Sequence, residues 1–296
     1  MDSQGNSLRP AAIRPAAPWV WLALASLLPG CTGQLTPAQR ASAMGFEDRI
    51  VAGDGFEHRV FSARHPSTGL LHIYIEGDGR AWRDRGTINA DPTPVEPLML
   101  ELMALDRGPR AYVGRPCYLG LAGSAACDPR QWTSHRYSAD TVQSMKSVID
   151  RLAAEGDYDG ILLFGHSGGG TLATLLASRI AGVRALVTVA PNLDVAAWAG
   201  LHGYSPLDGS LDPARTHDFP FGIMQVHWLG GRDENIPPAL ALSLEPAVED
   251  AEFRVAASFD HACCWSSIWP AQLDELQVVI PSTRALRAQP TDEGDR

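Results

Sequence analysis

The sequence predicts an α/β protein with a mostly parallel central sheet, and three observations lead to this prediction. Short apolar runs alternate along the chain with segments whose apolar residues recur at helical spacing. The run 161–164 is apolar throughout, which is typical of a strand that is covered on both faces. Strands that alternate with helices favour parallel pairing, with helices on both faces of the sheet.

The individual elements follow from these periodicities, taken in chain order. From Phe46 onward the pattern becomes strand-like, and the alternation in 58–64 is typical of an edge strand. We expect strands at 58–64, 70–75, 111–113, 161–164, 185–190, 223–229 and 253–256, and helices at 139–154, 168–180 and 266–276.

One long segment, 192–220, breaks this rhythm. It holds three prolines, three glycines and no long apolar period, and it includes Trp198, His202 and Tyr204. Long insertions in α/β folds are commonly functional, so we expect a short cap insertion over a site. No repeat or second core is visible, which predicts one domain over 46–285 and a loose tail at 286–296.

The charge balance restricts the possible partners. The chain carries 34 acidic and 24 basic side chains, a formal charge of −10, and 45% of its residues are hydrophobic. This composition is ordinary for a globular protein. Nucleic acid requires a basic surface, so we expect no nucleic-acid partner. We expect a monomer.

The N-terminus has the features of an export signal. Arg9 and Arg14 precede an apolar run at 18–28, which is too short to span a bilayer. The run ends in Leu28-Pro-Gly-Cys31 and resembles a bacterial lipobox. The interpretation is a signal peptide over 1–30, lipidation of Cys31 and a tether over 31–45. Because Thr32 follows the cysteine where an Asp would favour the inner membrane, we expect a lipid-anchored protein of the bacterial cell envelope, in the outer membrane facing the periplasm. The alternative is a plain signal peptide cut near Gly33.

Four cysteines remain in the exported chain. They are Cys117, Cys127, Cys263 and Cys264, an even number that suits an oxidising compartment. Three pairings are possible, and we favour Cys117–Cys127 with a vicinal Cys263–Cys264 pair. The cysteines lack the spacing of a zinc site, so we expect no metal.

The segment 161–170 carries the chemistry. A buried strand runs into Gly165-His166-Ser167-Gly168-Gly169, and a helical pattern follows. A strand that turns sharply into a helix exposes the serine hydroxyl and needs glycines where a Cβ would clash. We therefore expect Ser167 to be a nucleophile, with His166 inside the turn and pointing elsewhere.

A serine nucleophile needs a base and an acid that orients the base. The strand at 223–229 ends in a loop with Asp233 and Glu234, and the strand at 253–256 is followed by Asp260 and His261. We expect His261 to be the base and Asp233 the acid. Glu234 is the second choice for the acid, and Asp260 is a weaker rival.

The elbow with its acid and base in this order resembles the α/β-hydrolase superfamily, in particular exported bacterial serine esterases of lipoprotein type. The resemblance spans residues 46–281. It implies the α/β-hydrolase fold and a catalytic Ser167, Asp233 and His261 with no cofactor.

The same resemblance implies where a tetrahedral oxyanion would bind. Gly168, directly after the nucleophile, would give one N–H donor. The loop Glu76-Gly77-Asp78-Gly79 resembles the His-Gly-x turn of esterases, with Glu76 in place of the histidine. The backbone of Asp78 would then be the second donor, with Gly79 beside it.

The expected function is a serine hydrolase, most directly a carboxylesterase that acts on a small-molecule ester through an acyl-enzyme. The alternatives are a peptidase or amidase of the same fold and a non-catalytic binding lipoprotein of the envelope. Arg136 either binds an acidic group of the substrate or forms a structural ion pair, which we favour.

Overall fold

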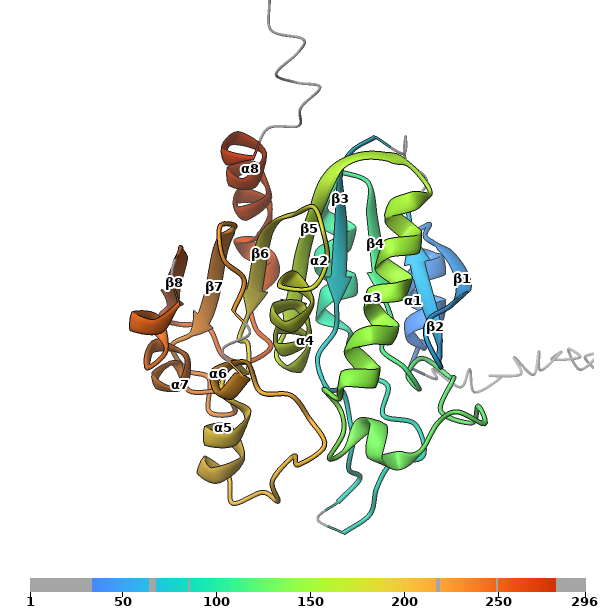
Figure 1. Ribbon diagram of the computed structural model, residues 1–296, viewed down its shortest axis with the longest axis vertical. Coiled ribbons are helices and arrows are strands. Elements are labelled where there is room, and N and C mark those ends of the chain that lie inside the picture. Colours follow the sequence, from blue (N-terminus) through green and yellow to red (C-terminus); the bar gives the residue numbers. More distant parts are fainter. Residues whose placement is uncertain (1–33, 64–67, 85, 217–218, 249, 281–296) are drawn as a thin grey trace, which may run out of the picture. The chain divides into compact units, whose positions relative to one another are not determined.

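The fold is built on one eight-stranded sheet. The computed structural model describes residues 34–63, 68–84, 86–216, 219–248 and 250–280, and the unit that begins at Leu35 contains every strand. The strand order is β1-β2-β4-β3-β5-β6-β7-β8, with β1, β2 and β4 joined antiparallel and all later pairs parallel (Figure 1). The strands are β1 Glu47–Ala52, β2 Glu57–Ser62, β3 Thr68–Ile75, β4 Arg110–Val113, β5 Asp157–His166, β6 Val183–Val189, β7 Met224–Gly230 and β8 Ala251–Ala256. The predicted α/β class and mostly parallel sheet are confirmed.

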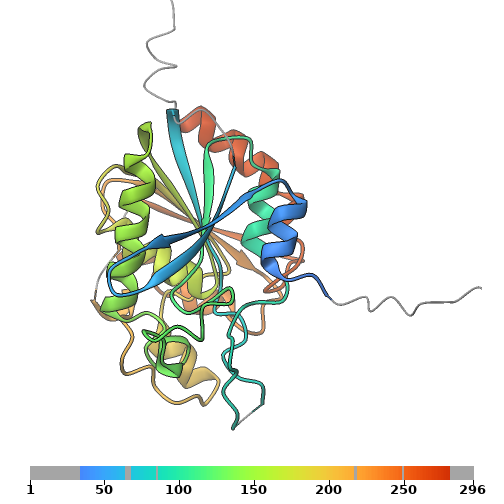
Figure 2. The same cartoon turned by 90° about the vertical axis from the view of Figure 1, so that its right-hand side faces the viewer.

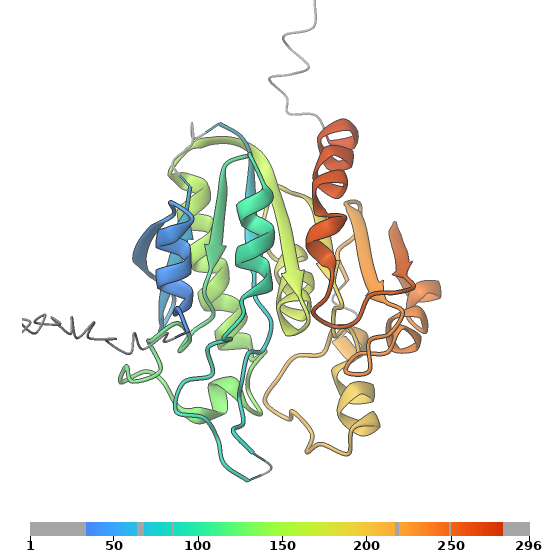
Figure 3. The same ribbon diagram turned by 180° about the vertical axis from the view of Figure 1, so that it is seen from behind.

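Helices cover both faces of this sheet. They are α1 Pro37–Ala43, α2 Leu98–Leu105, α3 Ala139–Ala154, α4 Gly168–Ala177, α5 Val195–Leu201, α6 Pro213–Thr216, α7 Pro238–Leu242 and α8 Trp269–Val279. Figure 1 shows α3 and α4 on the near face, and Figure 3 shows α1, α2 and α8 on the opposite face. Figure 2 views the sheet between these two layers. Helix α2 was not predicted.

The alternation of side chains along the central strands divides the core into two layers. In β5, Leu162 and Phe164 pack with α2 and α8, whereas Ile161 and Leu163 pack with α3 and α4. Phe164 stacks on Tyr74 of β3, with ring centroids 4.6 Å apart. Burial on both faces explains why β5 is apolar without interruption.

The segment expected to be a tether forms part of the domain. Residues 37–43 form α1, and a capping box between Thr36 and Gln39 starts the helix. Ala41 is fully buried in the core. The structure therefore corrects the expected tether over 31–45, because the domain begins at this helix. The predicted signal peptide, Cys31 and the tail at 286–296 lie outside the described residues.

The two disulfides form in the predicted pairs, Cys117–Cys127 and Cys263–Cys264. Within the described ranges, no cluster of histidines, cysteines and carboxylates could hold a metal ion. No helix among these residues has both the length and the apolar character to cross a bilayer.

Two histidines away from the elbow, His58 and His227, are completely buried. The His58 ring donates through Nδ1 to the carbonyl of Gly114 (2.8 Å), which leaves Nε2 as the acceptor for the Ser144 hydroxyl (2.8 Å). The His227 ring lies 2.7 Å from the Thr188 hydroxyl, inside the sheet. Burial lowers the pKa of His58 to about 4 and that of His227 to about 3.

These histidines predict a loss of stability in mild acid. Unfolding returns each ring to a pKa of about 6.5, so the unfolded chain binds more protons between pH 6.5 and pH 4. The stabilisation present above pH 6.5 should decline by up to about 1.4 kcal/mol per pH unit for each ring as pH falls. His227→Gln, measured by urea unfolding at pH 7.5, 6 and 5, should reduce this slope. An unchanged slope would show that the ring is not buried in its neutral form.

Candidate active site

The turn between β5 and α4 presents Ser167 at the carboxyl edge of the sheet. Ser167 has φ +53°, a conformation that non-glycine residues rarely adopt and that is typical of a nucleophile elbow. A Cβ at Gly165 would collide with the carbonyl of Gly169, and one at Gly169 would collide with the carbonyl of Ile75. The predicted glycines are therefore required by the close approach of the backbone to itself.

A hydrogen-bonded relay connects Ser167 to His261 and Asp233. The distance from His261 Nδ1 to Asp233 Oδ2 is 2.7 Å, and from His261 Nε2 to Ser167 Oγ it is 3.0 Å. Because the carboxylate can only accept, Nδ1 carries the proton, and the unprotonated Nε2 is the acceptor for the serine proton. This is the tautomer that a general base requires. Ser167 is largely buried, with 8% of its surface exposed, whereas the His261 side chain is 25% exposed.

The contacts also distinguish Asp233 from the other two candidate acids, Glu234 and Asp260. The Asp233 carboxylate is fully buried, and its Oδ1 accepts from the amides of Asn235 (2.9 Å) and Ile236 (2.8 Å). Glu234 is exposed to solvent. Asp260 accepts from the amides of Ala262 and Cys263 and so holds the loop after the histidine. Among the three carboxylates, Asp233 is the one that bonds to the imidazole.

The three residues expected to supply oxyanion donors have backbone amides without a protein acceptor. Within the described part of the chain, the amides of Gly168, Asp78 and Gly79 donate to no protein acceptor. Gly79 has φ +62°, and a side chain there would collide with the carbonyl of Pro92. Glu76, which stands where esterases have a histidine, accepts from the amides of Gly77 (3.1 Å) and Met99 (2.8 Å). Its carboxylate thus ties this loop to the start of α2.

His166 does not point away from the site, as the sequence had led us to expect. Its Nε2 donates to the carbonyl of His261 (2.9 Å), and the two rings lie 4.9 Å apart. The distance of 95 residues between these two positions hid the contact from sequence analysis. His166 therefore helps to hold the backbone that carries the base.

Asn235 is a second residue that sequence analysis missed. Its side-chain Nδ2 lies 3.1 Å from His261 Nε2. Its backbone carbonyl accepts from Trp198 Nε1 (3.1 Å) and from His202 Nε2 (2.7 Å). Trp198 and His202 belong to the insertion 192–220, so this predicted cap rests directly on the loop that bears Asp233. A single Asn after the acid gave no recognisable signal in the sequence.

The Asp78 side chain is the centre of a buried ionic cluster. Its carboxylate accepts from Arg115 Nη1 (2.5 Å), Arg136 Nη1 (2.8 Å) and the Tyr137 hydroxyl (2.6 Å). Burial alone would raise the pKa of Asp78, but the charges of Arg136 and Arg115 outweigh it and hold this pKa below its ordinary value. The favoured interpretation of Arg136 as a structural ion pair agrees with this contact.

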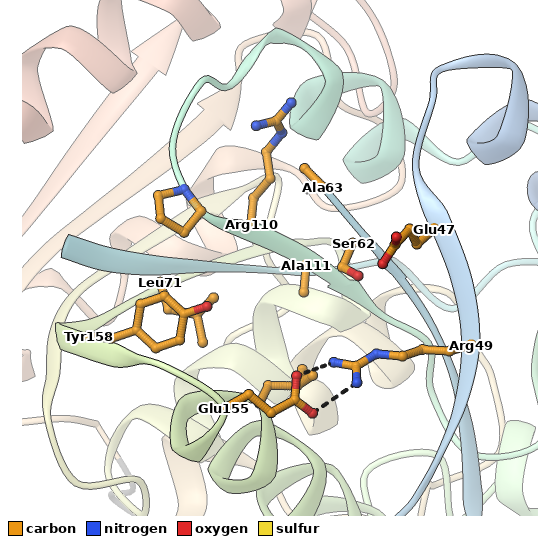
Figure 4. Close-up of a pocket in the computed structure, with 11 residues that line it drawn as sticks. Glu47, Arg49, Ser62, Ala63, Leu71, Arg110, Ala111, Glu155 and Tyr158 are labelled. Carbon is orange, nitrogen blue, oxygen red and sulfur yellow. Dashed lines mark hydrogen bonds and ion pairs between the residues drawn. The ribbon is translucent and has the colours of Figure 1, made fainter. Parts of the chain in front are cut away.

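A surface pocket of about 350 Å³ lies at the end of the sheet opposite Ser167 (Figure 4). It is lined by Leu71 and Ala111, near the amino ends of parallel strands, and by the Arg49–Glu155 ion pair. Ser167 follows the carboxyl end of β5, so this pocket belongs to a different end of the molecule.

Solved structures resemble this chain in fold. An esterase from Pyrococcus furiosus matches with a TM-score of 0.58 at 12% identity, over 83% of this chain and 94% of that chain. Est1E from Butyrivibrio proteoclasticus matches at 0.55 and 14% identity, over 78% and 98%. An acylaminoacyl peptidase from Pyrococcus horikoshii matches at 0.53 and 12% identity, over 79% of this chain and 40% of that chain. No family model and no curated protein matches the sequence. The likeness shows the α/β-hydrolase fold.

The packing predicts that alanine destabilises the protein at Gly168 but not at Gly200, although both glycines lie in helices. A Cβ at Gly168 would collide with Asp78 Oδ1 and the Tyr137 hydroxyl, whereas one at Gly200 in α5 would meet no atom within 4 Å. Gly168→Ala should therefore reduce the free energy of unfolding by about 1–3 kcal/mol. Gly200→Ala should raise it by up to about 1 kcal/mol, because alanine favours the helix. Urea unfolding of both variants provides the test, and equal effects would contradict the described contact.

Proposed function

We propose that this protein is a serine hydrolase that cleaves carboxylic esters. The observation that carries the proposal is the relay from Ser167 through His261 to Asp233, with distances of 3.0 Å and 2.7 Å. The positive φ of Ser167 and the amides of Gly168 and Asp78, which have no protein acceptor among the described residues, support the same chemistry. An esterase and Est1E are among the structures with the same fold, which agrees with an ester substrate.

In the proposed mechanism, Ser167 attacks the ester carbonyl while His261 Nε2 accepts its proton. Asp233 orients the imidazole and stabilises it once it is charged. The amides of Gly168 and Asp78 donate to the oxyanion of the tetrahedral intermediate. His261 then protonates the leaving alcohol, and water hydrolyses the acyl-enzyme with the same histidine as base. Every step uses groups of this chain, so no cofactor is invoked.

A peptidase or amidase is the nearest alternative within this mechanism. The acylaminoacyl peptidase shares the fold, but the match covers only 40% of that chain. The short insertion 192–220, which carries α5 and α6, is the cap that this chain supplies beside the site. We therefore favour an ester of a small molecule over a peptide substrate.

The first test is covalent labelling of Ser167 with a fluorophosphonate, followed by mass spectrometry of the adduct. We expect labelling of the wild type, none of Ser167→Ala, and much slower labelling of His261→Ala. Asp233→Asn should lower kcat for p-nitrophenyl butyrate by roughly 10⁴-fold, because the imidazole loses the partner that fixes its tautomer.

Matched variants separate the relay from its neighbours. Glu234→Gln and Asp260→Asn change the rival carboxylates and should leave kcat within a few-fold of the wild type. Hydrolysis of a peptide p-nitroanilide in preference to the ester would favour the peptidase alternative. A folded wild type that neither labels nor hydrolyses any ester would point to a non-catalytic binding protein of the envelope.

We further propose that the protein is exported and anchored by lipid at Cys31, on the outer membrane facing the periplasm. The apolar run at 18–28 and the sequence Leu28-Pro-Gly-Cys31 support this, together with two disulfides that suit an oxidising compartment. Expressed as the full chain in a Gram-negative host, the protein should fractionate with membranes and incorporate labelled palmitate. Cys31→Ala should abolish both signals. Release of the wild type in soluble form, cut near Gly33, would overturn the anchor.

A further inference from the structure

Two buried arginines converge on a single carboxylate beside the proposed nucleophile. Arg115 follows β4 and Arg136 lies just before α3, yet both bond to Asp78 in the loop after β3. Arg115 is 2% exposed and Arg136 is 8% exposed. Burying two guanidinium groups costs free energy. Their shared contact with a single carboxylate therefore indicates a specific role for these two side chains.

Hydrogen bonds hold both the side chain and the backbone carbonyl of Asp78. Its carboxylate accepts from both arginines and from the Tyr137 hydroxyl, and its carbonyl accepts from the Tyr118 hydroxyl (3.0 Å). With side chain and carbonyl both held, the orientation of the peptide units around Asp78 is restricted. The amide of the same residue makes no hydrogen bond to an acceptor in the described part of the chain.

The cluster also carries an excess of positive charge. Besides Asp78, Arg115 donates to the carbonyl of Arg136 (2.9 Å) and Arg136 donates to that of Thr133 (2.8 Å). Both of these acceptors are neutral, and among the described residues no second carboxylate forms an ion pair with either arginine. Two positive charges and one negative charge leave the cluster at about +1.

The Asp78 side chain lies against Gly168, whose amide is a proposed oxyanion donor. The Asp78 carboxylate and the Tyr137 hydroxyl are close enough to Gly168 that any side chain there would collide with them. A bare carboxylate at this place would repel the negative oxygen of a tetrahedral intermediate. Two arginines paired with this one carboxylate more than offset its charge, and fixed charges act strongly on a developing negative charge where water is scarce.

We propose that Arg115 and Arg136 are positioning and charge-compensating residues of the oxyanion site: they hold the Asp78 loop against Gly168 and more than offset the negative charge of the Asp78 carboxylate there. The inference rests on the proposed hydrolase function. It is favoured over direct binding of an anionic substrate group, because both guanidinium groups are buried and already bonded to Asp78 and to backbone carbonyls.

The test varies the charge of the cluster and measures kcat and KM for p-nitrophenyl butyrate, a neutral ester. Arg136→Gln lowers the cluster from about +1 to 0 and should reduce kcat by roughly 100-fold with little change in KM. Arg136→Lys keeps the charge and should stay within about tenfold of the wild type. The double variant Asp78→Asn/Arg136→Gln returns the cluster to +1 and should recover roughly tenfold in kcat over Arg136→Gln alone.

The double variant separates charge from structure. If the arginine only supported the fold, removing a further partner would lower kcat again, and that result would overturn the proposal. Arg254→Gln is the matched control. Arg254 lies on β8, the last strand in the sheet order, and pairs with Glu275 rather than Asp78, so this change should leave kcat unchanged. Should Arg136→Gln fail to fold, Tyr137→Phe removes one bond to Asp78 and should lower kcat roughly tenfold at constant KM.

Two other outcomes would count against the inference in different ways. Mono-4-nitrophenyl succinate, an anionic ester, should respond to the variants as the neutral ester does. A rise in KM confined to this ester, with normal kcat for the neutral one, would mean that the arginines bind an acidic substrate group. A wild type that is neither labelled by the fluorophosphonate nor active on esters would overturn the proposed function itself, and the inference with it.

Discussion

The site depends on one constraint, the abrupt reversal of the backbone from β5 into α4 at Ser167. The strand must end and the helix begin within a single residue, which puts that residue at a positive φ and brings strand and helix backbones into contact. Glycines at 165 and 169 make this contact possible. The carbonyl of Ile75 on the neighbouring strand packs so closely against Gly169 that a side chain there would collide with it. The same reversal brings the β3 loop beside the serine, so the position of Asp78 follows from the turn.

Around this turn, the loops at the carboxyl edge of the sheet are linked to one another. His166 holds the loop of His261 through the carbonyl of that residue, and the insertion 192–220 holds the loop of Asp233 through Asn235. Each contact joins segments that are far apart in the chain. The relay distances are therefore a property of the packed edge as a whole, which is how a rigid scaffold can position groups carried on loops.

The charged groups near Ser167 are arranged around the Asp78 carboxylate. Its carboxylate has a depressed pKa although it is buried, because two guanidinium groups face it. The cost of burying these charges is offset by short hydrogen bonds on both carboxylate oxygens. A buried ionic cluster contributes little net stability compared with an apolar core of similar volume. Its position next to the proposed nucleophile Ser167 therefore favours a functional role over a stabilising one.

The sequence by itself determined the elements whose signals are local. The apolar run 161–164, the glycines around Ser167 and the spacing of Asp233 and His261 predicted the sheet class, the turn and the relay, because burial and backbone sterics act on neighbours in the chain. The capping box that starts α1 is also local, although the tether interpretation passed over it. Only the tertiary structure decided that His166 faces His261 and that Arg115 and Arg136 share Asp78. These pairs are 95, 37 and 58 residues apart, and such contacts depend on how strands are ordered in the sheet, which no local pattern encodes.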